Sequence, residues 1–511
     1  MNSTVNTTTN NLSAEHVDVL IIGAGISGLG AACHLQNETS NKSYLILEGR
    51  DSIGGTWDLF RYPGVRSDSD LYTFGYDFKP WHGQPIAQAG EILNYLNDVV
   101  DENNLAENIR FNQWVTNADW STDDARWSVT VRGTEGEAEK VYTGNFLFMC
   151  QGYYNYEAGH LPDFPGQDDF KGQLIHPQKW PEDLDYRGKK MVVIGSGATA
   201  ATILPAVAED VAHVTQLQRS PSYYMALDNS AEDEVIEELR AIDTPLEWIH
   251  GIKRRRMLEF GREMTARSMS EPDEVRAELL DAAREALPEG YDVEKHFAPS
   301  YSPWKERLCL LPDGDMFAAI KSGKASVATD HIERFTETGI QLKSGEFLEA
   351  DIIVAATGIE LCGLGNISYN VDGVPTDAAD KFTYRGVLIS DMPNLAWIFG
   401  YIRTSWTMRS DMIAHYVCRL LNHMDELGVA QCTPKLRPED QGMNGKGYID
   451  PEDFSPGYMR RGIHRLPKQS DSGPWTNSQD YYSEKDELPN APFDDGALVF
   501  SNPKSDNTQA A

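Results

Sequence analysis

The sequence predicts an α/β protein built from two Rossmann-like dinucleotide-binding domains with a helical insertion. Two observations support this prediction. An apolar run, a glycine-rich loop and a helix follow one another at Val17–Gln36, and the same order returns at Met191–Val207. The stretch from about Asp228 to Phe297 is instead highly charged and has helical periodicity. A chain of 511 residues is long enough for two or three domains.

The first strand–loop–helix unit has the spacing of a dinucleotide-binding loop. Gly23 makes the tight turn, Gly25 lets the backbone approach a pyrophosphate, and Gly28 lets the helix pack on the strand. The helix N-terminus then presents free N–H groups to the phosphates. Glu48 ends the second strand twenty residues beyond Gly28, where a carboxylate accepts ribose hydroxyls and repels a 2′-phosphate. The unit therefore predicts a site for FAD or NAD.

The second unit ends in a residue of opposite charge. Gly195, Gly197 and Ala200 occupy the glycine positions, and Arg219 follows nineteen residues after Ala200. A guanidinium at that place can bind a 2′-phosphate through paired, charge-assisted hydrogen bonds. The alternative is an ordinary surface arginine at a strand end. The unit predicts NADPH, and the two sites together imply an electron path from NADPH to a flavin.

A longer motif lies between the two glycine loops. Phe170–Pro181 reads FKGQLIHPQKWP, which has the pattern FxGxxxHxxxWP. With this motif the chain resembles the class B flavin monooxygenases, and the final Trp-Pro resembles the Baeyer–Villiger type. Further matches lie at Gly54–Trp57, Arg61–Asp70, Gly152–Tyr156, Pro303–Cys309 and Ala356–Gly358. Asp58–Gly64, Leu466–Gln469 and Pro474-Trp475 look like the branch of ethionamide-activating and long-chain-alkane monooxygenases in particular.

The resemblance implies an activity and two catalytic residues. NADPH would reduce FAD, the reduced flavin would capture dioxygen, and the flavin peroxide would convert aliphatic or cyclic ketones to esters or lactones. Oxidation of sulfides is the expected side activity. Arg307 matches the family's active-site arginine, whose fixed positive charge stabilises a peroxide anion. Asp68 matches the acid that positions this arginine, although from sequence alone either residue could be a surface ion-pair partner.

The resemblance also implies roles for the fingerprint residues and further cofactor contacts. The fingerprint residues Phe170, Gly172, His176 and Trp180 are expected on the linker between the domains. No other histidine lies at metal-ligand spacing from His176, so we expect no metal site. For His176 the resemblance implies a conformational role, which couples NADPH binding to domain motion. The other expected cofactor contacts are Ser27, Gly55, Thr56, Trp57, Asp68, Tyr72, Val115, Ala198, Thr199 and Ser220.

These assignments divide the chain into discontinuous domains. Residues 1–160 and 361–511 are expected to form the FAD-binding domain, the latter range including the C-terminal tail. Residues 161–225 and 325–360 are expected to form the NADPH-binding domain, and residues 226–324 a helical insertion that caps the active site. The basic cluster Lys253–Arg256 within the insertion is either a solvated helix face or a contact for an anionic cofactor or lipid.

Two departures from the related branch bear on substrate and cofactor preference. Relatives usually have Tyr-x-Asn-Ala-Ser-Trp where this chain has Arg403 and Thr404 within Tyr401–Trp406. If this segment lines the pocket, the substrate preference differs from that of the relatives. Glu306 stands before Arg307, where other Baeyer–Villiger enzymes can offer a lysine to the NADPH phosphate. Arg219 is then expected to make that contact alone.

The composition excludes several partners. Seventy-eight acidic against 45 basic side chains give a net charge of −33, which repels nucleic acid and anionic lipid. The expected partners are dioxygen and a small apolar organic substrate. The 6 cysteines include no CxxC pair, which argues against a redox-disulfide flavoenzyme and favours a reducing compartment. Without a signal-peptide core or an apolar stretch of about 18 residues, we expect a cytoplasmic protein, at most peripheral to a membrane.

Two other activities stay open at the level of sequence. One is hydroxylation of long alkanes, which only the resemblance suggests, because a flavin peroxide is a weak oxidant for an unactivated C–H bond. The other is a poorly coupled NADPH oxidase or a flavoprotein sensor. Arg307 with Asp68 argues against a sensor, which has no need of a peroxide-stabilising charge. NADPH consumption with and without a ketone separates these readings.

Overall fold

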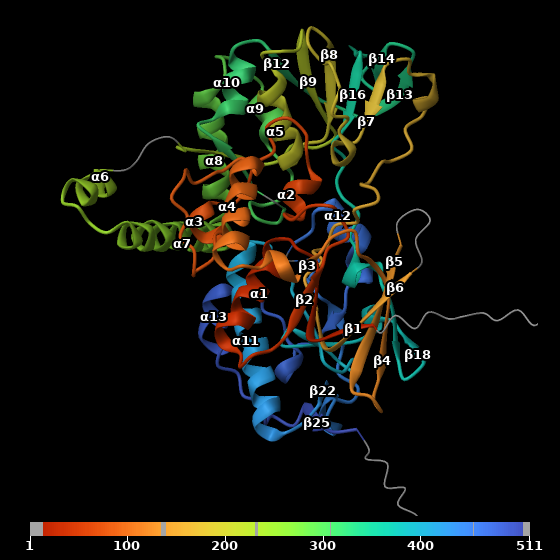
Figure 1. The fold of residues 1–511 in the computed structure, drawn as a ribbon. Coiled ribbons are helices and arrows are strands. Elements are labelled where there is room, and N and C mark those ends of the chain that lie inside the picture. The colour runs from red at the N-terminus through yellow and green to blue at the C-terminus, as the bar shows by residue number, and fades with distance from the viewer. Residues whose placement is uncertain (1–13, 134–138, 230–233, 307, 453, 504–511) are drawn as a thin grey trace, which may run out of the picture.

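The structure is a computed structural model that describes residues 14–133, 139–229, 234–306, 308–452 and 454–503. Its two largest sheets lie in two halves of the molecule, which Figure 1 shows one above the other. The chain passes from the lower of these sheets to the upper one after strand β6 (Lys140–Met149) and returns to the lower one after β16 (Ile352–Ala355). We call the upper half the inserted half and the lower half, which contains both ends of the described chain, the terminal half. The predicted α/β fold class is confirmed.

The parallel core of the terminal half begins with the first predicted strand. β1 (Glu15–Ile22) pairs in parallel with both β2 (Tyr44–Leu47) and β6. β2 and the last four residues of β1 (Val19–Ile22) and of β6 (Phe146–Met149) are apolar and buried, as expected for a parallel sheet that is covered on both faces. Helices α1 (Ile26–Glu38) and α11 (Trp406–Leu427) pack against each other and share one hydrophobic cluster with this sheet. A helix from the last quarter of the chain therefore covers the first strand–loop–helix unit.

Antiparallel strands extend this sheet on one side. β4 (Trp114–Ser121) and β5 (Arg126–Arg132) alternate inward and outward side chains, and β5 pairs with β6. Trp120 and Trp127, which face each other across the two strands, are buried in the second cluster of this half. The remaining strands of the sheet are β3 (Ile109–Arg110), β17 (Ser368–Val371), β18 (Val374–Thr376), β19 (Thr383–Tyr384), β20 (Leu388–Ile389) and β21 (Leu395–Trp397).

The inserted half contains a five-stranded parallel sheet in the order β12-β9-β8-β16-β7. Its strands are β7 (Gln173–Ile175), β8 (Lys190–Ile194), β9 (His213–Gln218), β12 (Ala325–Thr329) and β16. Helices α5 (Ala198–Val207) and α10 (Asp315–Lys321) pack together in the hydrophobic cluster on one face. A small antiparallel sheet of β13 (Ile332–Thr336), β14 (Gly339–Leu342) and β15 (Phe347–Glu349) lies beside it.

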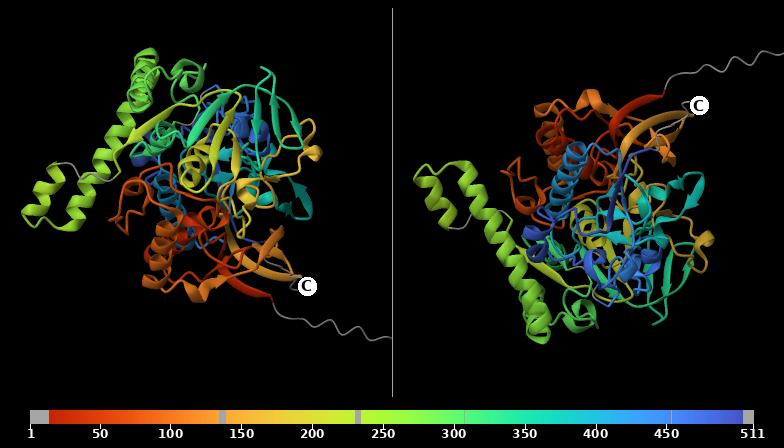
Figure 2. Two further views of the ribbon diagram at one scale, coloured as in Figure 1. Left: turned by 90° about the horizontal axis from the view of Figure 1, so that it is seen from above. Right: turned by 90° about the horizontal axis from the view of Figure 1, so that it is seen from below.

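Between β9 and β12 the described chain is mainly helical. Its helices are α6 (Glu234–Ala241), α7 (Leu246–Ser270), α8 (Pro272–Ala286) and α9 (Val293–Phe297). Figure 2 shows α6 and α7 extending from the side of the molecule. Lys253 and Arg254 of the basic cluster reach the terminal half. The Lys253 ammonium bonds to the Tyr72 hydroxyl at 3.1 Å, and Arg254 pairs with Asp77 at 2.5 Å. The cluster thus joins the two halves at this point.

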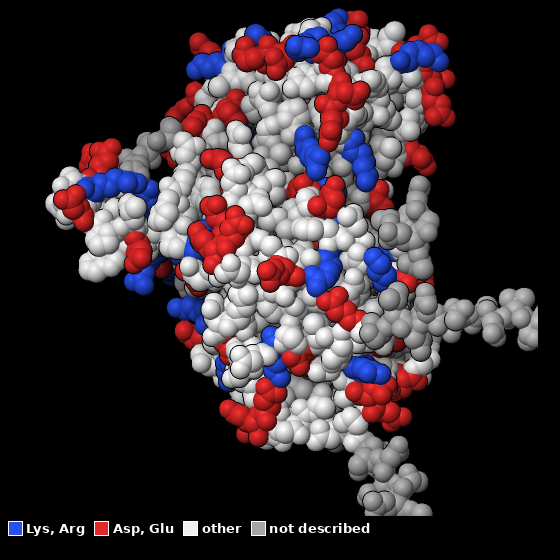
Figure 3. All heavy atoms as spheres, in the orientation of Figure 1, with Lys and Arg blue, Asp and Glu red and all other residues white. Residues whose placement is uncertain are grey.

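The remaining helices and strands complete the described chain. They are α2 (Thr56–Leu59), α3 (Leu71–Phe74), α4 (Ala89–Glu102), α12 (Gly457–Gly462), α13 (Tyr481–Glu487), β10 (Tyr224–Leu227), β11 (Cys309–Pro312), β22 (Gln431–Pro434), β23 (Lys446–Gly447), β24 (Lys468–Gln469) and β25 (Leu498–Ser501), with short 3₁₀ turns between them. Acidic and basic side chains are interspersed over the face shown in Figure 3. Among the described helices, none is both long and apolar enough to cross a membrane.

Candidate functional site

One cavity of about 740 Å³ reaches both glycine-rich loops. The first loop contributes Gly23, Gly25 and Ser27, and the second contributes Gly195–Thr199. Each loop follows the carboxyl end of a parallel strand and leads into a helix N-terminus, which is where open α/β sheets bind ligands. The two predicted nucleotide sites therefore share a single cavity.

The three positions of the first loop differ in how strictly the surrounding protein requires glycine. Gly23 has φ of +104°, and a Cβ there would lie 2.8 Å from the carbonyl oxygen of Cys150. A Cβ on Gly28 would lie 1.9 Å from the carbonyl oxygen of Gly23, so strand and helix require this glycine. A Cβ on Gly25 would meet no atom closer than 3.5 Å. This is an ordinary van der Waals distance, to the Gly55 backbone, so packing within the protein does not require glycine at position 25. Gly25 lines the cavity, where its bare backbone would let a phosphate approach.

Glu48 lies beneath the first loop and lines the cavity. One carboxylate oxygen accepts a hydrogen bond from the Ala24 amide at 2.7 Å, and the other accepts from the Arg50 amide at 2.9 Å. Burial raises the pKa of Glu48, while these two amides act in the opposite direction. Each carboxylate oxygen can accept a further hydrogen bond, so the side chain can still receive ribose hydroxyls.

An aromatic side chain from the far end of the sequence joins the first loop. Trp406, at the start of α11, donates from Nε1 to the Ser27 hydroxyl at 2.8 Å. The Tyr153 ring stacks on Trp406 with centroids 5.3 Å apart. Both rings line the cavity, as do Gly55, Thr56, Trp57 and Val115 from the predicted set. Of the other predicted contacts in this half, Gly28 is buried outside the lining, and Tyr72 hydrogen bonds to Gly83 outside the cavity.

The second loop also contains one glycine that packing within the protein requires and one that it does not. Gly195 has φ of +137°, and a Cβ would lie 2.3 Å from the carbonyl oxygen of Ala356. A Cβ on Gly197 would meet nothing within 4 Å. Ala198 and Thr199 line the cavity at the start of α5, whereas Ala200 is fully buried behind them. Gly197 is therefore the position of this loop that leaves room for a ligand.

Arg219, which the sequence predicted as the 2′-phosphate ligand, lines the cavity beyond the second loop. Arg219 and Ser220 both line the cavity, and the Arg219 side chain is exposed. Within the described part of the chain, Arg219 forms no ion pair and no hydrogen bond. Glu306 also lines the cavity; burial raises its pKa, and the charges of Arg460 and Arg219 oppose that rise. An arginine available to an external anion is the feature that a 2′-phosphate site requires.

Of the two predicted catalytic residues, the structure describes Asp68. Asp68 is half-buried and lines the cavity, next to Ser69. Arg307 lies outside the described residues, and its neighbour Glu306 lines the cavity.

The fingerprint residues lie beside the cavity and not in its lining. Phe170 packs edge-on against Phe335, and a Cβ on Gly172 would lie 2.2 Å from the carbonyl oxygen of Asp351. Trp180 packs edge-on against Tyr186 with centroids 6.3 Å apart. The motif therefore fastens β7 and the segment after it to the sheet of the inserted half.

His176 has a definite hydrogen-bonding state. Its Nε2 lies 3.1 Å from the Gly358 carbonyl oxygen, and its Nδ1 accepts from the Gln178 amide at 3.2 Å. The proton therefore resides on Nε2, and the ring is neutral. Burial lowers the pKa of His176, partly offset by the bond to Gly358. This geometry ties the fingerprint segment to the Ala356–Gly358 turn, which itself lines the cavity.

Several cavity residues were not predicted from the sequence. Arg461 of α12 lines the cavity and donates to the carbonyl oxygen of Ile359 at 3.2 Å. Burial lowers its pKa, and its guanidinium forms no ion pair with a described carboxylate. Trp114 and Arg132 line the part near Glu48, where Arg132 lies over the Trp114 ring at 5.7 Å. The one signal in the sequence that residues from the C-terminal part of the chain line the cavity was the difference between this chain and its relatives within Tyr401–Trp406.

The fold and this shared cavity define the class of two-domain nucleotide-binding oxidoreductases. A family model described as "Flavin-binding monooxygenase-like" matches residues 16–231. The FAD-containing monooxygenase EthA of Mycolicibacterium smegmatis is 46% identical over 489 residues, which cover 95% of this chain and 97% of that protein. The probable FAD-binding monooxygenase AlmA of Acinetobacter baylyi is 46% identical over 492 residues, with 95% and 96% covered. The chain therefore belongs to the FAD-containing monooxygenase family, as the motifs indicated.

Solved structures agree in fold. A steroid monooxygenase bound to NADP aligns with a TM-score of 0.75 and 22% identity, covering 95% of this chain and all of that one. A cyclohexanone monooxygenase bound to ε-caprolactone aligns with a TM-score of 0.69 and 23% identity, covering 84% and 91%. At these identities the likeness establishes the fold.

Proposed function

We propose that the protein is an FAD- and NADPH-dependent Baeyer–Villiger monooxygenase. It converts aliphatic or cyclic ketones to esters or lactones and oxidises sulfides as a side activity. The observation that carries the proposal is the single cavity that contains Glu48 below one glycine loop and Arg219 beyond the other. A carboxylate at one end and an available guanidinium at the other suit two dinucleotides of different charge.

The residues present fit both cofactors. FAD would occupy the first loop, with its pyrophosphate beside Gly25 and a ribose on Glu48. NADPH would occupy the second, with its pyrophosphate beside Gly197 and its 2′-phosphate on Arg219. The domains we propose follow from this arrangement: residues 1–160 and 361–511 for FAD, and 161–225 and 325–360 for NADPH. Residues 226–324 form the insertion, of which no described residue in α6–α9 lines the cavity.

The chemistry divides between cofactor and protein. When bound and reduced by NADPH, FAD activates dioxygen so that one oxygen atom enters the substrate and the other leaves as water. The protein shields this reaction from water with the apolar side chains of Phe74, Ile402 and Trp406, which line the cavity. Asp68, which lines the cavity, and Arg307, if it lies beside it, would supply charges next to the reacting atoms. The positive charge of Arg307 would stabilise negative charge that develops on the carbonyl oxygen of a ketone.

The relatives support this assignment at different levels. The proteins that share 46% identity carry the names FAD-containing and probable FAD-binding monooxygenase, which support flavin and oxygen chemistry here. One structural neighbour is named cyclohexanone monooxygenase and is bound to ε-caprolactone, the lactone that corresponds to this ketone, which supports the Baeyer–Villiger reaction as a proposal here. All six cysteines are buried and none forms a disulfide, which suits a reducing, cytoplasmic compartment.

The proposal is tested with FAD-loaded protein, NADPH and a panel of ketones, one sulfide and one long alkane. We expect ketone-dependent NADPH oxidation and an ester or lactone in the product mass spectrum. The variant Arg307→Ala should retain bound FAD and lose this product. A product found only from the alkane would favour alkane hydroxylation. Steady NADPH consumption that gives only hydrogen peroxide with every compound would refute the monooxygenase and favour an oxidase or sensor.

A further inference from the structure

The C-terminal segment Ser478–Glu484 holds one wall of the cavity. The wall is formed by Tyr401 and Ile402, which line the cavity and are 3% and 7% exposed. The amide of Ile402 donates to the Gln479 side-chain oxygen at 3.3 Å, and the Gln479 side-chain nitrogen donates to the Gly400 carbonyl oxygen at 3.3 Å. A single side chain thus clamps the backbone on both sides of Tyr401.

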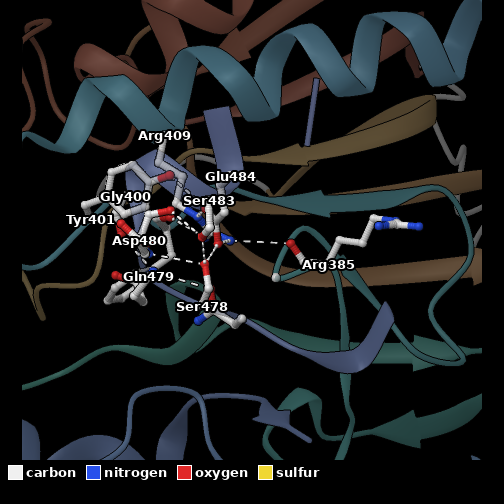
Figure 4. Close-up of polar contacts among 12 residues, drawn as sticks. Arg385, Gly400, Tyr401, Arg409, Ser478, Gln479, Asp480, Ser483 and Glu484 are labelled. Carbon is white, nitrogen blue, oxygen red and sulfur yellow. Dashed lines mark hydrogen bonds and ion pairs between the residues drawn. The ribbon is translucent and has the colours of Figure 1, made fainter. Parts of the chain in front are cut away.

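A second contact fixes the Tyr401 ring. Its hydroxyl donates to a carboxylate oxygen of Glu484 at 2.8 Å, and Figure 4 shows this contact beside Arg409. Tyr401 lines the cavity but Glu484 does not, so the hydroxyl points away from the cavity and into the protein. Burial and the neighbouring Glu484 charge raise the pKa of Tyr401. The hydroxyl therefore stays protonated and remains a donor at every working pH.

Glu484 is itself fixed by a buried arginine. Arg409, on the first turn of α11, has a fully buried side chain and donates from Nε to Glu484 at 2.8 Å. It also donates to the Phe399 carbonyl oxygen and to the Tyr448 hydroxyl, both at 2.9 Å. Burial would raise the pKa of Glu484, but Arg409 lowers it below its usual value, so the carboxylate is ionised.

A buried ion pair is a costly way to stabilise a fold, because both charges lose their hydration. Such a pair is better explained by what it orients. Here it directs one carboxylate at the hydroxyl of a cavity-lining ring, and α13 brings that carboxylate from a segment 83 residues further along the chain. Without this hydrogen bond, the Tyr401 ring would be free to occupy other rotamers and to project into the cavity.

We propose that Glu484 is a positioning residue that holds the Tyr401 ring against the substrate, so that this wall determines how long a substrate chain the cavity accepts. The inference rests on the proposed ketone oxidation and names a specificity-determining residue for it. A long ketone would extend along Tyr401 and Ile402, whereas a very short one would occupy only the space beside the reacting carbonyl.

The test is Tyr401→Phe, which keeps the ring and removes only the hydrogen bond. Changing Glu484 first is less informative, because Arg409 would be left buried without its counter-charge. Tyr482→Phe is the matched control. Tyr482 lies on α13, the helix that carries Glu484. Its hydroxyl donates to the Leu258 carbonyl oxygen and does not contact the cavity wall.

Two readouts are compared for both variants. Steady-state kinetics with a short and a long linear methyl ketone should show that Tyr401→Phe raises KM for the long ketone by roughly 10- to 100-fold, the loss expected for one hydrogen bond to a charged group. We expect kcat for both ketones and KM for the short one to stay within about twofold. Hydrogen exchange measured on the peptide spanning residues 399–405 should become faster. Tyr482→Phe should change neither readout.

The inference is overturned if Tyr401→Phe retains the wild-type KM for both ketones and the wild-type exchange, or if Tyr482→Phe produces the same changes. An equal rise in KM for short and long ketones would also overturn it, because a general disturbance of the site would then be the cause. If the wild-type protein oxidised no ketone, the proposed function would fail, and the exchange measurement would still decide whether the hydrogen bond to Glu484 orders the Tyr401 wall.

Discussion

Replacing Gly197 by alanine separates ligand binding from stability. No protein atom lies within 4 Å of a Cβ built at this position, and the backbone at φ −83° and ψ −175° is open to any residue. Gly→Ala lowers the entropy of the unfolded chain, which stabilises by about 0.4–1 kcal/mol. Alanine is a poorer N-cap than glycine, which costs an amount of the same order. We therefore expect the melting temperature to change by less than about 4 °C.

Cofactor binding should respond quite differently. The added methyl group would project from the loop into the space assigned to the NADPH pyrophosphate. The phosphate would then lose at least one hydrogen bond to a backbone N–H, which is worth about 1.5–3 kcal/mol for a charged acceptor. This loss corresponds to a dissociation constant for NADP⁺ that is about 10- to 100-fold higher.

The assay is titration calorimetry of NADP⁺ into FAD-loaded protein, with melting followed by circular dichroism. Gly251→Ala on α7, where a Cβ also meets nothing within 4 Å, serves as the control and should bind NADP⁺ normally. Gly195→Ala should instead fold poorly, because its Cβ would lie 2.3 Å from the Ala356 carbonyl oxygen. If Gly197→Ala binds NADP⁺ within twofold of wild type, the assignment of this loop to NADPH is wrong.

Three further substitutions test other parts of the site. Arg219→Ala should lower the preference for NADPH over NADH, measured as the ratio of kcat/KM, by about 10- to 100-fold, whereas Arg187→Ala, on an exposed arginine already paired with Asp185, should leave the ratio unchanged. Glu48→Gln should release FAD on desalting, seen in the flavin-to-protein absorbance ratio, because an amide cannot accept from both backbone N–H groups beneath the loop. Burial lowers the pKa of His176, so its contribution to stability is complete above the unfolded pKa of about 6.5 and is lost as the pH falls below it. Urea denaturation should therefore show a smaller loss of stability between about pH 7 and about pH 5.5 in His176→Gln than in wild type, and equal losses would contradict this account.

Features that depend on short stretches of chain could be predicted from the sequence. The two glycine loops are examples, since the positive φ of Gly23 and Gly195 and the contact of Gly28 arise within one strand–turn–helix unit. Glu48 follows from the same unit, because the end of the next parallel strand lies beside the loop. These positions are local consequences of one supersecondary structure.

Contacts between distant segments could not be predicted in this way. Trp406 and Ser27 are 379 residues apart, and their hydrogen bond depends on α11 returning to cover α1. Tyr72, an expected cofactor contact, shows that nearness in sequence is also an unreliable guide. It lies close in sequence to Asp68, but α3 turns its side chain toward Gly83 and α7 and away from the cavity. Spacing along the chain does not determine which side of a short helix faces a ligand.

The most direct test of the central claim is oxidation of a cyclic ketone by FAD-loaded protein and NADPH under isotopically labelled dioxygen. The account predicts a lactone that carries one labelled oxygen atom, with one NADPH consumed for each lactone formed. Unchanged ketone together with labelled hydrogen peroxide in amounts equal to the NADPH consumed would contradict it.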